Sequence, residues 1–447
     1  MNKRPHFIIQ FICVSLVFAA IMLQSFTNMI KMKPLNGFDK EEQDPVALTF
    51  KTYYDGTYQD YLTEHAKRNT GFREFFIRNY NQMAYSCFNK ITNNNIVKGR
   101  DQELYLKMYL NEIAGITFQQ NFADVETAKA EAQKNVKETL RLIDTLHQHG
   151  SEFLFVFAPT KPAIYPDKLP SYYRNHIFEF SLEEYYIQLF KENNIPHIDF
   201  YNHFKSLRSS FPYPLYPRTG THWSEATIPY VADSILKKLA EITHYKLPSV
   251  RYIDDNLTTD YSVQDGELEA SMNLLFPLDK PALPRPIFEL TDTLGADKPN
   301  LLVVGDSYFT QLRISPFVKA FNNWEFWVYN RDIESSDDSH RWKPLEMLIG
   351  ADDVLENADI VMAVFTAPMY YNYMFGFTQT AQNLFAKGVI SDEAGLKAVI
   401  QHIKDNEDWL KAVEEQAKER GITTEENIRI NAQYYLETRQ RNKKQSD

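Results

Sequence analysis

The chain has 447 residues, of which 44% are hydrophobic and 24% charged, and it carries a formal net charge of −11. This is an ordinary globular composition, and the acidic balance without any basic stripe argues against nucleic-acid binding. The two cysteines, Cys13 and Cys87, are too few for a disulfide framework or a thiolate zinc site.

The first element is an uncharged run from Phe7 to Phe26, which follows Lys3 and Arg4. A helix of about 20 residues spans roughly 30 Å, the thickness of the apolar core of a bilayer. No clear cleavage site follows the run, so the sequence predicts an uncleaved signal anchor with Lys3 and Arg4 inside. A cleaved signal peptide is the alternative. Both interpretations place residues 35–447 on the far side of the membrane.

Residues 111–390 alternate between helices and short apolar runs. A helix predicted from Glu126 to His149 ends at Gly150 and leads into FLFVFAP at 153–159, a run typical of a strand buried on both faces. The alternation predicts an α/β fold with a mainly parallel sheet and flanking helices. The further predicted strands lie at 195–200, 301–306, 324–329 and 358–365.

Four divisions of the chain are expected. Residues 1–34 form a cytoplasmic stub and the anchor, and residues 35–110 form a helical juxtamembrane region with apolar side chains at helical spacing. The α/β domain at 111–390 contains an insertion at about 246–297, which lacks clear periodicity and is interpreted as a cap over the sheet. Residues 391–447 are helical and highly charged, which predicts a solvated helical tail packed on the domain.

The strongest local motif is VVGDSYFTQL, in which a predicted strand ends in Gly–Asp–Ser and a helix follows from Tyr308. The pattern places Ser307 on a tight turn at the carboxyl end of a strand, where ligands bind in open α/β sheets. Backbone N–H groups at the start of the helix would face an oxyanion there. The alternative is a plain strand-to-helix turn in which Ser307 caps the helix.

A second motif, YPRTGTHWSEA at 216–226, offers a base for that serine. A serine hydroxyl is a weak nucleophile without one. Of the eleven histidines, His222 stands out because it lies in a loop just before a helix that Ser224 could cap, and Trp223 could pin its ring. A histidine beside a tryptophan is by itself more often structural, but the joint presence of the two motifs favours a Ser–His pair.

Together, VVGDSY and RTGTHWS resemble the SGNH-hydrolase-like (flavodoxin-like) domains of the alginate O-acetyltransferase family, the AlgJ and AlgX group. FVFAPTKPAIYPDKLP and IPHIDF are similar to two successive strand segments of that family. NTGFREFFIRNYNQMAYSCFNK and VKGRDQELY resemble its region between membrane anchor and catalytic domain. The resemblance covers roughly residues 50–385, and the histidine motif precedes the serine motif, as in the family.

The resemblance implies a membrane-anchored enzyme, periplasmic or at the cell surface, that moves acetyl groups onto hydroxyls of an exported or cell-surface polysaccharide. Ser307 would be the nucleophile that carries the acetyl group, and His222 the general base. No cofactor or metal is expected, and a multi-pass membrane O-acyltransferase would supply the acetyl groups. The residues expected to bind substrate are Lys161, Tyr165, Arg218, Trp223 and Tyr308.

One position departs from the family. Its usual motif is Asp–Thr–His–Trp, in which the aspartate orients the histidine, but this chain has Gly220 at that place. Three explanations remain open: Asp199 or Asp306 supplies the acid, a backbone carbonyl orients His222, or the domain is a non-catalytic scaffold that binds glycan. An esterase that removes acetyl groups is a further alternative, since water and a sugar hydroxyl are equivalent attackers.

Overall fold

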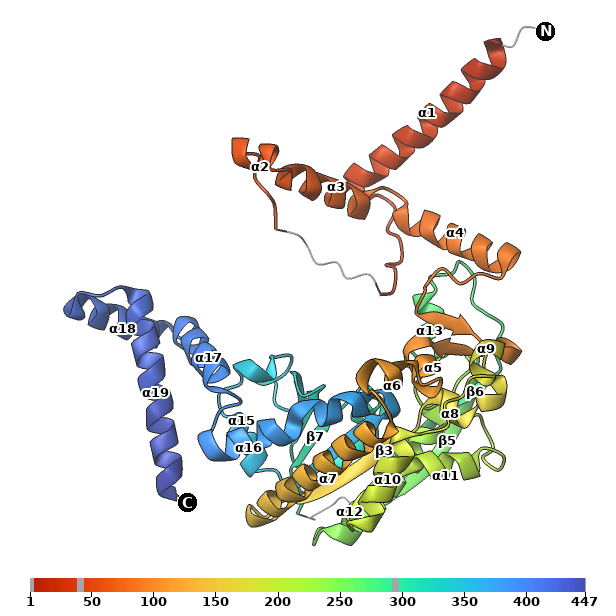
Figure 1. Cartoon of the computed structure of the whole chain (residues 1–447). Helices are drawn as coiled ribbons and strands as arrows, with labels where there is room; N and C mark the ends of the chain where they lie inside the picture. Colours follow the sequence, from red (N-terminus) through yellow and green to blue (C-terminus); the bar gives the residue numbers. More distant parts are fainter. Residues whose placement is uncertain (1–3, 38–43, 292–296, 447) are drawn as a thin grey trace. The chain divides into compact units, whose positions relative to one another are not determined.

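The computed structural model describes residues 4–37, 44–291 and 297–446. The chain divides into two compact units (Figure 1). The first unit consists of Met1–Lys98 with Gly266–Lys280, and the second of Gly99–Asp265 with Pro281–Asp447.

A six-stranded sheet forms the centre of the second unit, with the strand order β4-β3-β10-β7-β8-β9. Neighbouring strands from β4 to β8 are parallel, and β9 pairs with β8 antiparallel. The predicted α/β fold with a mainly parallel sheet is confirmed, with an antiparallel edge strand that the sequence did not predict. The strands are β3 (Glu152–Ala158), β4 (His197–Asp199), β7 (Leu301–Gly305), β8 (Trp324–Val328), β9 (Asp332–Ser335) and β10 (Ile360–Thr366).

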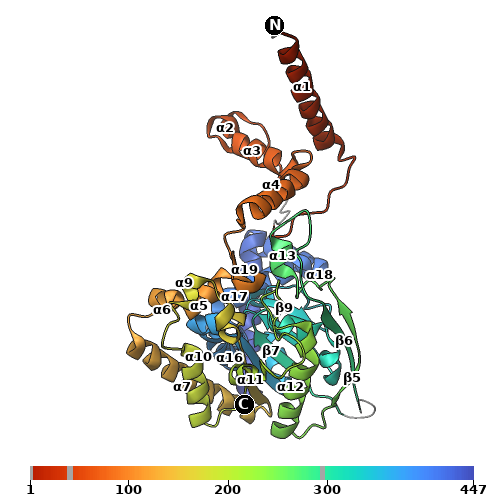
Figure 2. The ribbon, with the colours of Figure 1, turned by 90° about the vertical axis from the view of Figure 1, so that its right-hand side faces the viewer.

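Helices cover both faces of this sheet (Figure 2), because its central strands are apolar on both sides. Along β3, Phe155 and Phe157 join the core on one face, and Leu154 and Val156 join the core on the other. The first face is covered by α7 (Val125–Gln148), α10 (Leu182–Glu192), α15 (Ala351–Glu356) and α16 (Phe377–Lys387), and the second by α8 (Lys161–Ile164), α11 (Phe200–Leu207), α12 (Ile228–Ile242) and α14 (Phe309–Arg313).

The segment predicted to be an insertion, which lacks clear periodicity in the sequence, contains two paired strands. Strands β5 (Val250–Thr258) and β6 (Leu283–Leu290) pair antiparallel in a separate two-stranded sheet. The sequence pattern hid this pair, because most side chains of β5 are exposed on both faces and β6 carries Pro284 and Pro286. The insertion predicted at about 246–297 thus contains a regular strand pair, its residues 292–296 lie outside the described part of the chain, and its role as a cap over the sheet stays a prediction.

The C-terminal residues form three helices, as their helical pattern predicted. These helices enclose a small core of their own, which includes Val399, Ile403, Val413 and Ile428. Arg439 also donates to the Asp352 carboxylate on α15 at 2.7 Å, which ties the last helix to the sheet domain. The helices are α17 (Asp392–Asp405), α18 (Glu407–Arg420) and α19 (Thr424–Ser446).

The first unit is mainly helical. Within the described part of the chain, α1 holds the one stretch long and apolar enough to cross a membrane, His6–Thr27, with a mean hydropathy of 2.4. This finding fits the predicted single-pass anchor. The helices of the unit are α1 (Arg4–Thr27), α2 (Phe50–Tyr54), α3 (Thr57–Asn69), α4 (Arg73–Phe88) and α13 (Glu267–Ser271).

A buried carboxyl on α10 makes the stability of the second unit depend on pH. Burial raises the pKa of Glu183 well above its ordinary value of 4.5, and the neighbouring Glu112 and Asp199 raise it further. The folded protein therefore holds this proton more tightly than the unfolded chain. The resulting stabilisation is fully present below about pH 4.5 and is lost as the pH rises, at about 1.4 kcal/mol for each unit of pKa difference.

We expect Glu183→Gln to remove this dependence, because the amide keeps the shape of the carboxyl and cannot ionise. The variant should raise Tm relative to the unmodified chain more at about pH 8 than at about pH 5, as measured by thermal denaturation. The exposed Glu179→Gln is the control. An equal difference in Tm at both pH values would rule out a raised pKa at Glu183.

Candidate active site

The structure brings Ser307 and His222 into contact. Ser307 lies in the turn between β7 and α14, at the carboxyl end of a central strand, and His222 lies in the loop before α12. His222 Nε2 is 2.8 Å from Ser307 Oγ, although 85 positions separate the two residues in the chain. Both side chains are partly exposed, so a substrate can reach the serine. This is the geometry in which a histidine accepts the proton of a serine nucleophile.

The turn that carries Ser307 is held by the carboxylate of Asp306. The Asp306 side chain is 1% exposed and accepts hydrogen bonds from Tyr308 N at 3.0 Å, Thr366 N at 2.9 Å and Thr366 Oγ1 at 2.7 Å. Burial raises the pKa of Asp306, and these hydrogen bonds and the nearby His222 oppose the rise. Asp306 thus fixes the turn to strand β10, and its influence on His222 is electrostatic.

Asp199 lies at the carboxyl end of β4, an edge strand of the sheet. Its carboxylate caps α11 by accepting from Asn202 N at 2.9 Å, and it also pairs with Lys191 at 2.9 Å. Burial raises its pKa, but the bonds from Asn202 and Lys191 hold the pKa below its ordinary value. The Asp199 carboxylate thus caps the helix that follows the edge strand β4. The expectation that Asp199 orients His222 is corrected.

Two aromatic residues expected to bind substrate support the histidine loop instead. The Tyr308 hydroxyl donates to the Thr221 carbonyl at 2.8 Å, which links the serine turn to the residue before His222. Trp223 packs edge-to-face against Tyr308, with ring centroids 5.2 Å apart. Both side chains are fully buried and present no surface to a substrate. The prediction of substrate binding is therefore corrected for Trp223 and Tyr308.

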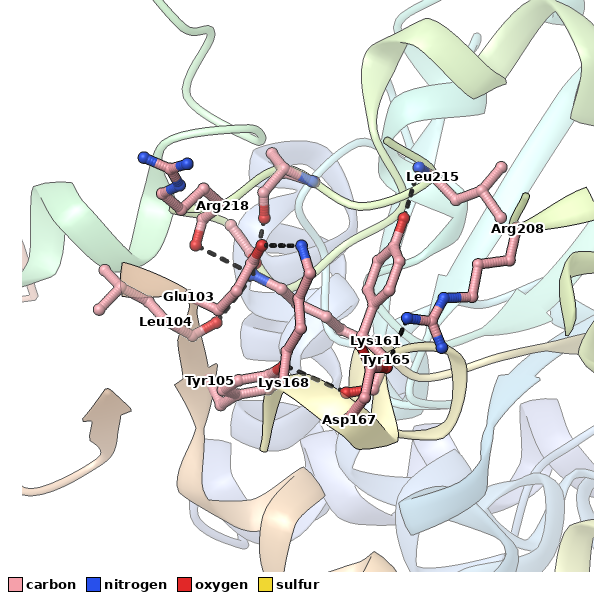
Figure 3. A network of polar contacts seen from close by, with 12 residues as sticks. Glu103, Leu104, Tyr105, Lys161, Tyr165, Asp167, Lys168, Arg208, Leu215 and Arg218 are labelled. Atoms are coloured by element: carbon pink, nitrogen blue, oxygen red, sulfur yellow. Dashed lines mark hydrogen bonds and ion pairs between the residues drawn. The ribbon is translucent and has the colours of Figure 1, made fainter. Parts of the chain in front are cut away.

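The buried side chain of Lys161 holds the loop segment that leads to His222 in place (Figure 3). The Lys161 ammonium donates to the carbonyls of Pro217 at 2.7 Å, Arg218 at 3.0 Å and Gly220 at 3.1 Å. It also donates to the Leu104 carbonyl at 2.9 Å. These oxygens belong to two different segments, so one side chain fixes both of them. Because Lys161 has no exposed surface, the expectation that it contacts substrate is wrong.

Glu103 neutralises the buried lysine. Its carboxylate lies 3.0 Å from Lys161 Nζ and 2.8 Å from Lys168 Nζ. Burial alone would raise the pKa of Glu103, but the two ammonium groups hold it below its ordinary value. An ion pair this deeply buried is stable only because the charges compensate each other and the backbone carbonyls satisfy the remaining protons.

Tyr165 also belongs to this support rather than to a substrate cleft. Its hydroxyl accepts a hydrogen bond from Leu215 N at 2.9 Å, just upstream of the histidine motif. Figure 3 shows Tyr165 beside Arg208, which pairs with Asp167. The Tyr165 side chain is buried, so its expected contact with substrate is corrected. Arg218 is partly exposed, and the contact of its side chain with an acidic sugar remains a prediction.

A steric constraint explains why position 220 is a glycine. A Cβ atom at this position would lie 2.8 Å from the Asp265 carbonyl oxygen and 2.9 Å from the Gln264 carbonyl oxygen, distances that real Cβ atoms do not show. The segment at 264–265 also binds the loop directly, since Thr219 Oγ1 donates to the Asp265 carbonyl at 3.1 Å and the Asp265 carboxylate accepts from Glu225 N at 3.0 Å. Backbone thus occupies the space that a side chain at position 220 would need.

Restoring the family aspartate through Gly220→Asp is therefore expected to destabilise the domain. The new side chain must displace two backbone carbonyls, and overpacking typically costs about 1–3 kcal/mol. Chemical denaturation should show a lower midpoint, and ester turnover should fall as well. Increased turnover with unchanged stability would contradict this steric account.

Sequence reasoning missed Tyr329, which follows β8. Burial raises the pKa of the Tyr329 hydroxyl, and the neighbouring Ser307 opposes this rise. The φ of Tyr329, +53°, lies in the left-handed region, which is costly for a tyrosine and typical of functional sites. The available signal was its place at the carboxyl end of the strand next to that of Ser307.

A serine at the carboxyl end of a central parallel strand, with a histidine in a separate loop, is the arrangement of an SGNH hydrolase-like domain. A family model for the SGNH hydrolase-like domain of acetyltransferase AlgX matches residues 97–313, which include Ser307 and His222. The predicted resemblance is confirmed over this range: residues 97–313, just under half of the chain, match an SGNH hydrolase-like domain of the AlgX type. The domain is thus of the acyltransferase or esterase class.

Several solved structures are similar to part of the chain. The O-acetyltransferase domain of Pseudomonas putida AlgJ is 17% identical, with a TM-score of 0.39, and the match covers 62% of this chain and 92% of that chain. Pseudomonas aeruginosa AlgX is 15% identical (TM-score 0.40; 63% and 66% covered), and Bacillus cereus PatB1 is 13% identical (TM-score 0.33; 55% and 92% covered). No curated protein matches the chain.

Proposed function

We propose that this protein is an O-acetyltransferase that moves acetyl groups onto hydroxyls of an exported or cell-surface polysaccharide. The observation that carries the proposal is the 2.8 Å contact between His222 Nε2 and Ser307 Oγ. It lies inside the region that matches the AlgX acetyltransferase domain. A scaffold that only bound glycan would have no need for a base held against a partly exposed serine hydroxyl.

The first half of the reaction forms an acetyl-serine. Ser307 Oγ attacks the acetyl carbonyl carbon of the donor, and His222 Nε2 takes the hydroxyl proton. The tetrahedral intermediate carries its negative charge on the former carbonyl oxygen, near the Ser307 N–H and the Tyr329 hydroxyl. Collapse breaks the bond to the leaving group, which departs with the proton from His222. The acetyl group is then an ester on Ser307.

The second half reverses these steps with a new partner. A sugar hydroxyl attacks the acetyl-serine carbonyl while His222 Nε2 accepts its proton. Collapse returns the proton to Ser307 Oγ and leaves the acetyl group on the sugar. The charge of Asp306, buried behind the turn, favours the protonated histidine that forms in both halves, because the two groups interact electrostatically.

The proposed function also implies a cellular location and two partners for the protein. Helix α1 would anchor the chain as a single-pass membrane protein, with the second unit outside the cytoplasm in the periplasm or at the cell surface. Acetyl groups come from metabolism inside the cell, so a multi-pass membrane O-acyltransferase would deliver them. The polysaccharide acceptor would reach Ser307 from the carboxyl edge of the sheet.

The proposed transfer is tested by measuring how the acetyl group divides between a sugar acceptor and water. The full chain in detergent is mixed with a chromogenic acetyl ester, first alone and then with increasing amounts of an oligosaccharide acceptor. A transferase should give acetylated sugar, detected by mass spectrometry, at the expense of free acetate. Free acetate in an amount that does not change with any acceptor would favour an esterase instead. Absence of turnover and of acetyl-Ser307 would exclude both.

A further inference from the structure

The first unit carries an exposed apolar stripe next to the end of the membrane-spanning helix. On α4, four neighbouring side chains are largely exposed: Phe75 and Phe76 at 46%, Tyr80 at 57% and Met83 at 54%. At 3.6 residues per turn they project from one side of the helix, while Asn81 and Ala84 are buried on the other. We call these four residues the α4 stripe. Exposed apolar patches of this kind mark interaction sites.

The start of α4 is fixed against the last turns of α1. Gly71 N donates to Ser25 Oγ at 2.7 Å. A Cβ at Gly71 would collide with the Ile21 carbonyl oxygen and come within 2.8 Å of Gln24 Cβ, so only glycine permits this approach. Arg78 donates to the Lys33 carbonyl at 2.8 Å and to the Pro34 carbonyl at 2.9 Å, and thereby holds the chain that leaves α1.

These contacts set the depth of the α4 stripe. The apolar span runs from His6 to Thr27, and Gly71 contacts it between Ile21 and Ser25. At 1.5 Å per residue, those contacts lie about 3–9 Å inside the apolar end of the span. The stripe begins four residues after Gly71. Tyrosine is enriched at this boundary between headgroups and hydrocarbon, where amphipathic helices also bury phenylalanine.

We propose that α4 lies in the membrane interface, with the α4 stripe inserted into the lipid at the outer end of α1. The occupant of the stripe is the lipid surface, because Gly71 contacts α1 inside the apolar span and the stripe begins about one helical turn further along the chain. The protein would then be attached by a spanning helix and by an interfacial helix, which restricts how the first unit can tilt on its anchor. This inference rests on the proposed membrane anchoring.

Immersion depth tests the proposal on the full chain in nanodiscs of phosphatidylcholine and phosphatidylglycerol. A nitroxide label at Phe76→Cys, in a Cys13→Ser/Cys87→Ser background, is exposed to oxygen, which concentrates in lipid, and to a water-soluble nickel chelate. We expect oxygen to relax the label more strongly than nickel. The native Cys13, labelled in a Cys87→Ser chain, is the internal standard for the span.

The possible results distinguish failure of the interfacial helix α4 from failure of the membrane anchor α1. A nickel-accessible label at Phe76→Cys beside a lipid-exposed Cys13 would overturn the interfacial helix and leave the anchor intact. A water-exposed Cys13 would overturn both, while ester turnover by the second unit would be unaffected. A label at Phe76→Cys that is shielded from oxygen and nickel alike would mean that protein, not lipid, covers the stripe.

A matched pair of variants checks that the rings drive insertion. With the label at Met83→Cys, Phe75→Ser/Phe76→Ser/Tyr80→Ser should shift the label from oxygen towards nickel exposure. Phe75→Leu/Phe76→Leu/Tyr80→Leu should keep it in lipid, because these changes preserve apolar surface. Equal depth in both variants would contradict the proposal. A far-UV circular dichroism spectrum like that of the unmodified chain in both variants would show that the helices of each are folded.

Discussion

Ser307→Ala and His222→Ala are each expected to abolish turnover of an acetyl ester, with a fall in kcat/KM of at least about 10³-fold. Ser307→Ala removes the atom that forms the covalent bond. His222→Ala leaves a serine whose proton has no acceptor at 2.8 Å. Because the two groups act in one step, the double variant should be no worse than either single variant. Steady-state kinetics with a chromogenic ester measures all three.

Controls for this prediction are exposed residues of the same type, Ser210→Ala and His176→Ala, which should retain full turnover. Tm should change little in the Ser307 and His222 variants, since both side chains are partly exposed and neither fills the core. Retention of turnover by Ser307→Ala would place the chemistry elsewhere. A loss of turnover that is fully accounted for by unfolding of the variants would argue against a catalytic role for the pair.

Lys161→Met is expected to destabilise the second unit strongly. It removes an ammonium that donates to carbonyls on two segments and leaves Glu103 buried beside one remaining lysine. Breaking a buried pair on one side typically costs about 3–5 kcal/mol. Urea denaturation should show this loss directly. Turnover should fall as well, because the carbonyls of 217–220 lead into the loop that holds His222.

Lys168→Met is the matched control. Lys168 pairs with the same Glu103 carboxylate at 2.8 Å, but its side chain is partly exposed and part of its contribution is screened by water. Its loss should cost no more than about 1 kcal/mol and leave turnover nearly unchanged. Equal effects of the two variants would mean that Lys161 acts only as a charge for Glu103 and does not organise the loop.

Much of the fold follows from local patterns in the sequence. The run of phenylalanines in β3 predicts a strand with helices on both faces, and Asp124 and Gly150 bound α7 as helix caps do. Strands β5, β6 and β9 could not be predicted in this way. They lie at edges or in a separate hairpin, so their side chains follow no regular alternation of burial.

The same distinction between local patterns and long-range contacts applies to the residues of the candidate site. Ser307 and His222 could be predicted, because a serine after a buried strand and a histidine in a pre-helix loop each have a recognisable local context. Lys161, Tyr308 and Trp223 were expected at the surface of a cleft, and their burial depends on contacts between distant segments. Tyr329 was missed for a related reason: its contact with Ser307 comes from strand order, which the sequence does not state.

The most direct test of the proposed chemistry is the mass of the active-site peptide. The protein is mixed with an activated acetyl ester, quenched in acid and digested, and the peptide that contains Ser307 is analysed by mass spectrometry. The account predicts an acetyl group on Ser307 in the unmodified chain, and its loss in His222→Ala under the same conditions. No acetylation of Ser307, or the same extent of acetylation without His222, would contradict the proposed Ser–His mechanism.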